Sequence, residues 1–318
     1  MKISFLSRSI FLFCILSLLN DLSVFANPVS HEGPSLLEGR WDLVINKDGK
    51  QLPSWLEVQH SGTSTLIGRF VYAFGSARPV SHVKLTGNHF VFSIPPQWEP
   101  GTAYMEFEGD FAAGMLVGTM TYTDGKKYNF TGTRAPSLHR DTEPVWSTPI
   151  VLIGKTDMNE WHAMGNNQWK VADGILISSK SGSNLVTNKT FSDFKLHVEF
   201  KYPKGSNSGV YLRGRYEVQI VDSKGMEPWN DQFSAIYGFL PPNEMVAKSA
   251  DEWQTYDITL VGRTVTVVAN GKMVICNTVI PGITGGALDS KEGEPGPILI
   301  QGDHGPIEYR NIIITPSK

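Results

Sequence analysis

A clear alternation of apolar and polar positions lies between residues 207 and 222. Within residues 216–221, three apolar side chains alternate with Glu217 and Gln219, which predicts a strand with one apolar face and one polar face. Residues 209–213 predict a preceding strand, joined to it at Gly214. An acid and an amide are costly to bury without partners, so we expect this face to line a binding cleft.

Residues 38–134 predict a small antiparallel β-barrel. About eight short strand-like runs are separated by turn signals such as Lys47-Asp48-Gly49, and that many strands in so short a segment favour a closed or nearly closed barrel. The opening Gly39-Arg40-Trp41 and the late Arg134 resemble a lipocalin-type barrel, in which a Gly-x-Trp start packs against a late arginine. The predicted strands are 41–45, 55–59, 64–72, 80–85, 89–94, 103–108, 115–123 and 127–133.

Residues 135–149 are rich in proline and lack periodicity, which predicts a linker. Residues 150–318 then predict a second domain, a two-sheet sandwich of alternating strands with Gly- and Pro-rich loops. The Asn270-Gly271 pair predicts a tight hairpin turn, and only residues 244–251 suggest a helical period.

The first 26 residues predict a signal peptide. Two basic residues precede an apolar stretch, and Val24-Phe25-Ala26 forms a small-residue cleavage site, whereas the apolar stretch is too short for a membrane span. Residues 27–37 then form a leader. Cleavage would leave Cys276 as the only cysteine, so no intrachain disulfide is expected, and we interpret Cys276 as a core residue. These features predict a protein secreted to the bacterial periplasm.

Net charge restricts the partners. The 318-residue chain carries a formal charge of −3 and has no basic block, which argues against nucleic acid or an anionic membrane as the main partner. Aromatic residues make up 11% of the chain, which suits stacking on carbohydrate, although a β-sheet core accounts for most of them. The sequence leaves the oligomeric state open.

A series of motifs in the second half carries a family resemblance. They are Trp169-Lys-Val-Ala-Asp-Gly, Asn207-Ser-Gly-Val-Tyr-Leu-Arg, Tyr216-Glu-Val-Gln-Ile, Ser234-Ala-Ile-Tyr-Gly, Glu252-Trp-Gln-Thr-Tyr and Gln301-Gly-Asp-His-Gly. Over residues 145–316 the chain resembles the 3-keto-disaccharide hydrolase family, with Ser234 where a glycine is expected. The resemblance implies a concanavalin-like jelly roll that acts on glycosides oxidised at C3.

The chemistry of such a substrate identifies candidate residues. A ketone at C3 acidifies the hydrogen at C2, so a base can start an elimination that expels the C1 substituent, and hydration then completes a net hydrolysis. This route needs a base, an acid and a group that polarises the ketone. We assign catalysis to Glu217, Arg213 and His304. Substrate binding is assigned to Gln219, Glu199, Asn207, Asp222, Trp229 and Tyr237.

Two alternatives stay open at this point. A non-catalytic carbohydrate-binding module of the concanavalin-like type also fits the pattern. Asp222, Asp231, Asp303 and His304 are residue types that bind Ca²⁺ or a transition metal, but their spacing follows no standard ligand pattern, so the sequence indicates no definite cofactor. Asp222 would share the face of Glu217 only if a bulge intervened.

Overall fold

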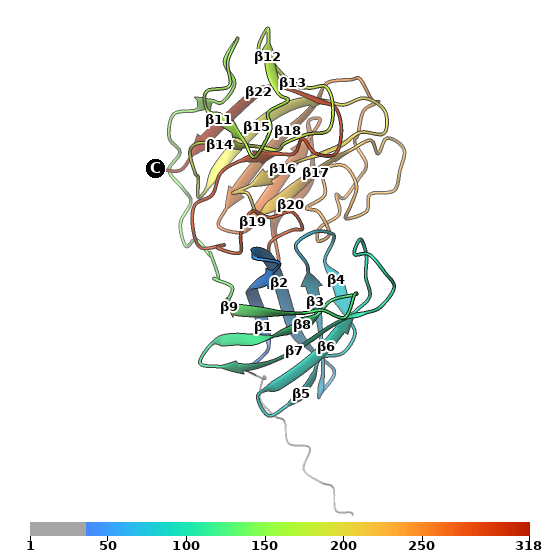
Figure 1. Ribbon diagram of the computed structural model, residues 1–318. Helices are drawn as coiled ribbons and strands as arrows, with labels where there is room; N and C mark the ends of the chain where they lie inside the picture. Colours follow the sequence, from blue (N-terminus) through green and yellow to red (C-terminus); the bar gives the residue numbers. More distant parts are fainter. Residues whose placement is uncertain (1–35) are drawn as a thin grey trace, which may run out of the picture. The chain divides into compact units, whose positions relative to one another are not determined.

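The computed structural model describes residues 36–318, so the predicted signal peptide and residues 27–35 of the leader lie outside the described range. Every regular element in the described part is a strand, which confirms the all-β class of a barrel followed by a jelly-roll sandwich (Figure 1). Residues 244–251 form a loop. Across residues 36–318, no helix has the length and hydropathy to span a membrane.

The first part is one antiparallel sheet of nine strands in the order β4-β3-β2-β1-β9-β8-β7-β6-β5. The sheet curls so that β4 and β6 come into contact, although no hydrogen-bonded ladder joins β4 to β5. Its strands are β1 (Gly39–Lys47), β2 (Lys50–Ser61), β3 (Thr65–Val71), β4 (Arg78–Val80), β5 (Lys84–Thr86), β6 (His89–Ile94), β7 (Met105–Ala112), β8 (Met115–Thr121) and β9 (Lys127–Arg134).

The barrel core follows the predicted alternation. Inward and outward positions alternate without a break along β6 and β7, so the phenylalanines of these strands meet inside the barrel. Phe92 and Phe107, for example, stack with ring centroids 4.7 Å apart. The single strand predicted over residues 80–85 is instead divided between β4 and β5, because the chain bends between them.

The lipocalin-type signature has the expected geometry. The Arg134 guanidinium lies 3.8 Å from the centre of the Trp41 ring, and it donates hydrogen bonds to the carbonyls of Leu36 and Glu38. Gly39 has φ of 112°, and a Cβ there would lie 2.7 Å from Arg134 Nη1. The glycine, tryptophan and arginine therefore close the barrel end as one packed unit.

The second part is a sandwich of two antiparallel sheets that share one hydrophobic core. The larger sheet contains β10 (Ile150–Val151), β12 (Lys170–Ala172), β13 (Ile175–Ser178), β15 (Phe194–Lys201), β18 (Gln254–Val261), β19 (Thr264–Ala269), β20 (Lys272–Val279) and β22 (Ile307–Pro316). The smaller sheet contains β11 (Trp161–Ala163), β14 (Leu185–Thr187), β21 (Leu299–Ile300), β16 (Asn207–Leu212) and β17 (Tyr216–Val221).

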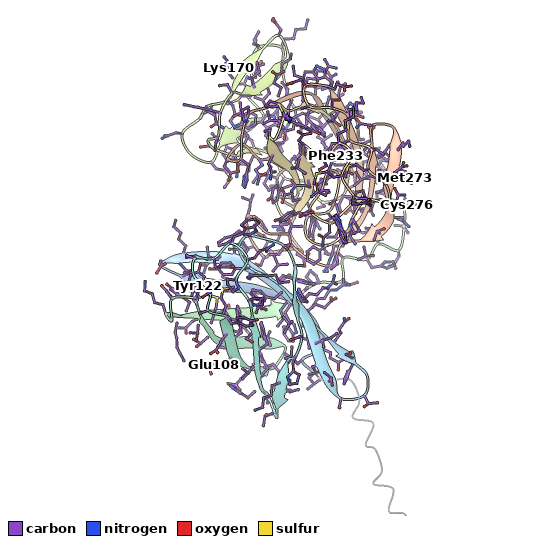
Figure 2. The ribbon with its side chains drawn as sticks, turned by 90° about the vertical axis from the view of Figure 1, so that its right-hand side faces the viewer. Glu108, Tyr122, Lys170, Phe233, Met273 and Cys276 are labelled. Carbon is purple, nitrogen blue, oxygen red and sulfur yellow. The ribbon has the colours of Figure 1, made fainter. Side chains whose placement is uncertain are left out.

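One packing prediction for the sandwich is wrong. Phe233 is buried in the shared core, whereas Cys276 is exposed on β20 (Figure 2). The pairing of β19 with β20 is irregular between Val265 and Val268, and Val274 and Ile275 are consecutive buried residues. This bulge shifts the alternation, so Cys276 points to solvent instead of the core.

The barrel packs against the sandwich, and the described residues 36–318 belong to one compact unit. Trp55 meets Phe239 edge-on with ring centroids 5.2 Å apart, and Ser290 Oγ donates to the Leu43 carbonyl at 2.5 Å. Trp55 therefore belongs to the sandwich core although it lies on a barrel strand. The linker boundaries predicted at residues 135 and 149 stay a prediction.

Candidate active site

The polar face of β16 and β17 forms the floor of a cavity of about 490 Å³. The two strands pair so that Tyr211 lies opposite Glu217 and Gly209 opposite Gln219, while the alternate side chains enter the core. Gly209 has no side chain, and a Cβ there would collide with the Glu217 carboxyl group. The absence of a side chain at Gly209 therefore leaves space for the Glu217 carboxyl group to lie over β16.

Glu217 is a buried carboxyl group, with 4% of the residue exposed. Burial raises the pKa of Glu217 to about 8, against an opposing hydrogen bond with Tyr211. The acid is therefore predominantly neutral at neutral pH. A neutral carboxylic acid in a cavity is a natural proton donor.

Tyr211 is the hydrogen-bond partner of Glu217. The Tyr211 hydroxyl donates to Glu217 Oε2 at 2.9 Å and to the carbonyl oxygen of Gly285 at 3.0 Å, so two acceptors share its one proton. A donor of this kind stabilises the ionised carboxylate and lowers the pKa of Glu217, but burial has the larger effect.

His304 lies on the wall of the same cavity, beside an acid partner. Its Nδ1 is 2.7 Å from Asp303 Oδ1. The hydrogen bond to Asp303 raises the pKa of His304, and burial opposes the rise. Although burial favours the protonated acid, the hydrogen bond and charge of His304 lower the pKa of Asp303. The carboxylate therefore orients the imidazole and increases its basicity, as in other histidine–acid pairs.

Three amide oxygens in the cavity lack partners. Asn207 Oδ1, Gln219 Oε1 and Gln301 Oε1 are buried without a hydrogen bond, and all three residues line the cavity. An unsatisfied buried acceptor costs about 1–3 kcal/mol, so these oxygens are suited to a ligand that brings donors. The hydroxyl groups of a sugar are such donors, and the cavity volume is within the range of small-molecule sites.

Five of the nine predicted site residues line the cavity: Glu217, His304, Gln219, Asn207 and Tyr237. The structure does not bring Arg213 there. Its Nη2 donates to Tyr216 Oη and to the carbonyl of Gly262, both at 3.0 Å, in the buried turn after β16.

Glu199, Asp222 and Trp229 are also placed elsewhere. Glu199, on β15 of the larger sheet, accepts hydrogen bonds from Arg310 Nε and Asn311 Nδ2, both at 2.7 Å. Asp222 accepts from the backbone N–H of Gly205, and no bulge turns it toward Glu217. The Trp229 side chain is largely exposed outside the cavity.

Several cavity residues escaped the sequence analysis. Tyr211 shares the strand parity of Asn207 and Gly209, so alternation could have identified it. Asp303 and Gln301 lie in the Gln301-Gly-Asp-His-Gly motif, in which the sequence predicts a catalytic role for His304 alone. The barrel residues Phe74, Gly75 and Trp98 had no signal in the sequence, because they reach the cavity only through tertiary packing.

The metal candidates do not converge. Over residues 36–318, no three His, Cys, Asp or Glu side chains gather closely enough to hold a metal ion. Asp303 and His304 are hydrogen-bonded neighbours, whereas Asp222 is bound to the turn at Gly205.

The architecture and the acid-bearing cavity define an all-β sandwich protein of the jelly-roll class. More specifically, the chain belongs to the family described as the 3-keto-alpha-glucoside-1,2-lyase-like domain, whose model matches residues 148–315. The match begins after the barrel, so the family covers the sandwich alone.

Three individual relatives each share less than 30% sequence identity with the chain. A 3-keto-disaccharide hydrolase of Bacteroides thetaiotaomicron is 29% identical over 109 residues, which are 30% of this chain and 36% of the relative. The aligned part thus spans about a third of that relative. A solved structure of a candidate glycosyl hydrolase from Parabacteroides distasonis is 28% identical, with a TM-score of 0.46, and covers 57% of this chain and 96% of that chain. A second from the same organism is 26% identical, with a TM-score of 0.42, and covers 53% and 98%.

Proposed function

We propose that the protein cleaves 3-keto-glycosides by elimination across C1 and C2, followed by hydration. The observation that carries this proposal is that a buried, neutral Glu217 and a His304 oriented by Asp303 line the same cavity. An elimination needs one proton acceptor and one proton donor, and these two groups supply them. Membership of the lyase-like family supports the same reaction.

In the proposed reaction, neutral His304 removes the proton from C2. The electrons of the C2–H bond form a C1=C2 double bond, the C1–O bond breaks, and the departing oxygen takes the proton of Glu217. The Tyr211 hydroxyl donates to the Glu217 carboxylate that forms, which stabilises it as the proton passes to the substrate. The products are a 1,2-unsaturated 3-keto sugar and a free alcohol.

Hydration reverses both proton transfers. The Glu217 carboxylate takes a proton from water while the water oxygen bonds to C1, and His304 returns its proton to C2. The unpaired oxygens of Gln219 and Gln301 accept hydroxyl hydrogens of the ring. The NH₂ groups of the cavity amides offer donors to the ketone oxygen as negative charge develops there. Arg213 has no part in this scheme, because its guanidinium is held in the turn after β16.

The test is incubation of the purified protein with 3-keto-trehalose in D₂O, with divalent cations supplied, and with unoxidised trehalose as the control. We expect release of glucose, deuterium at C2 of the product, and no cleavage of trehalose, whose C2 hydrogen is not acidic. Glu217→Gln and His304→Asn should each lose at least about a hundredfold in rate, the usual scale of general acid–base catalysis. No cleavage of 3-keto-trehalose would refute the proposal. Tight sugar binding without turnover, equal in Glu217→Gln, would instead identify a carbohydrate-binding module.

We also propose that residues 1–26 direct export and are removed after Ala26. Mass spectrometry of the protein from the periplasmic fraction of an expressing bacterium should then give an N-terminus at Asn27. A full-length protein that stays in the cytoplasmic fraction would contradict this.

A further inference from the structure

Two loops of the barrel form part of the wall of the cavity that contains Glu217. Residues 72–77 connect β3 to β4 and provide Phe74 and Gly75, and residues 95–104 connect β6 to β7 and provide Trp98. The family model begins at residue 148, so neither loop belongs to the matched domain. The cavity is thus built from two parts of the chain with separate hydrophobic cores.

Trp98 is a large aromatic residue that lines the cavity and is nevertheless 68% exposed. The loop that carries Trp98 is held in place by the next residue, Glu99. The Glu99 side chain is completely buried, pairs with Arg78 at 2.8 Å, and accepts hydrogen bonds from the backbone N–H groups of Gln97 and Trp98. A buried, bidentate ion pair of this kind holds the loop that presents the exposed indole.

The first loop is held just as firmly. Gln97 exchanges two hydrogen bonds with Ser76, at 3.0 and 2.9 Å. Gly75 has φ of 85°, and a Cβ there would lie 3.1 Å from Trp98 Cδ1, so only glycine allows this close approach. Phe74 packs edge-on against the buried Tyr72, with ring centroids 5.0 Å apart. Preorganised, exposed aromatic rings lose little entropy when a ligand stacks on them.

The floor and this wall differ in chemistry. The floor offers the proton carriers and the unpaired amide oxygens of Gln219 and Gln301, which suit the ring that is cleaved. The barrel loops offer exposed aromatic surface and no charged side chain to the cavity. An aromatic surface of this kind suits the apolar C–H face of a second pyranose ring, the leaving group of a disaccharide.

We propose that the barrel loops form the leaving-group subsite, with Trp98 as the platform on which the sugar ring of the departing alcohol stacks. This proposal rests on the proposed function, since it assigns the second half of the same substrate. It makes the barrel a determinant of specificity for disaccharides over glycosides with small alcohols. Trp98 touches the leaving group and takes no part in proton transfer.

The experiment compares kcat/KM for 3-keto-trehalose and for methyl 3-keto-glucoside, whose methyl group is too small to stack. Trp98→Ala should lower the ratio of the two values roughly three- to tenfold, as expected for the loss of one aromatic contact. Trp98→Phe should restore most of the ratio. Tyr104→Ala is the matched control, because Tyr104 is an exposed aromatic of the same loop that does not line the cavity.

An unchanged ratio in Trp98→Ala, or an equal change in Tyr104→Ala, would overturn the subsite. If the wild-type protein turns over neither substrate, the proposed function has failed, and calorimetric titration with trehalose and methyl glucoside then tests the subsite alone. Selective weakening of trehalose binding by Trp98→Ala would support the platform. Equal weakening of both ligands, or no binding of trehalose, would overturn it.

Discussion

Replacing Glu217 with glutamine should make the folded protein more stable at alkaline pH. Glutamine has the shape of the neutral acid, and its amide oxygen can accept the hydrogen bond from Tyr211. It cannot ionise, so it avoids the cost of burying a charge. The residue that we assign to proton donation should therefore destabilise the wild-type protein whenever the pH favours its ionised form.

The size of the effect follows from the pKa of Glu217, which is about 8 in the folded protein against 4.5 ordinarily. Because the folded state binds this proton more tightly than the unfolded state, wild-type stability falls as pH rises from 4.5 to about 8. At about 1.4 kcal/mol for each pH unit, the full difference is roughly 5 kcal/mol above pH 8. Near pH 5 it is only about 1 kcal/mol.

The assay is urea unfolding of wild type and Glu217→Gln at pH 5, 7 and 9. The stability advantage of the variant should grow by about 4 kcal/mol across this range, while other titrating groups cancel in the comparison. Glu108→Gln is the control, because it makes the same chemical change at an exposed residue of β7. Parallel curves for wild type and Glu217→Gln would show that Glu217 is not held neutral, which would refute its role as the acid.

Two other changes test the hydrogen-bonded pairs of the cavity. Asp303→Asn removes the group that raises the pKa of His304, so the acidic limb of the kcat/KM–pH profile should move to lower pH; a limb that does not move would contradict the pairing. Tyr211→Phe removes the bond that lowers the pKa of Glu217, so the alkaline limb should move above pH 8. The same change leaves the Gly285 carbonyl unpaired and should cost about 1–3 kcal/mol in urea unfolding, whereas an unchanged profile and stability would argue against the bridge.

The residues of the cavity floor could be predicted because the pattern that places them lies within one short stretch of the sequence. Side chains alternate across a strand, so the apolar residues of β17 place Glu217 and Gln219 together on the opposite face. The same parity would bring Arg213 to the face of Tyr211. The chain leaves the strand there, however, since Arg213 has φ of 53° and Gly214 of 65°, and the arginine turns into the core beside Tyr216.

The wall of the cavity could not be predicted from local patterns. Trp98 is more than a hundred positions from Glu217 in the sequence, and nothing in its own loop distinguishes it from Tyr104. Residue type alone suggests Glu199 and Trp229, but Glu199 forms an ion pair with Arg310 on the larger sheet. Which acids and aromatics meet depends on how the two cores pack together, which alternation along a strand does not encode.

The barrel also affects the acid itself, through Gly285. This glycine lies against Gly75 of the barrel, where a Cβ would collide with the Gly75 carbonyl, and the next residue donates from its N–H to the Ala73 carbonyl at 2.8 Å. The carbonyl of Gly285 in turn accepts the Tyr211 hydroxyl that contacts Glu217. We therefore expect a sandwich without the barrel loops to lose the support of this segment, so that water reaches the carboxyl group and the pKa of Glu217 falls toward 4.5. The alkaline limb of the kcat/KM–pH profile should then move to lower pH in a variant with both loops shortened, and an unmoved limb would contradict this role of the barrel.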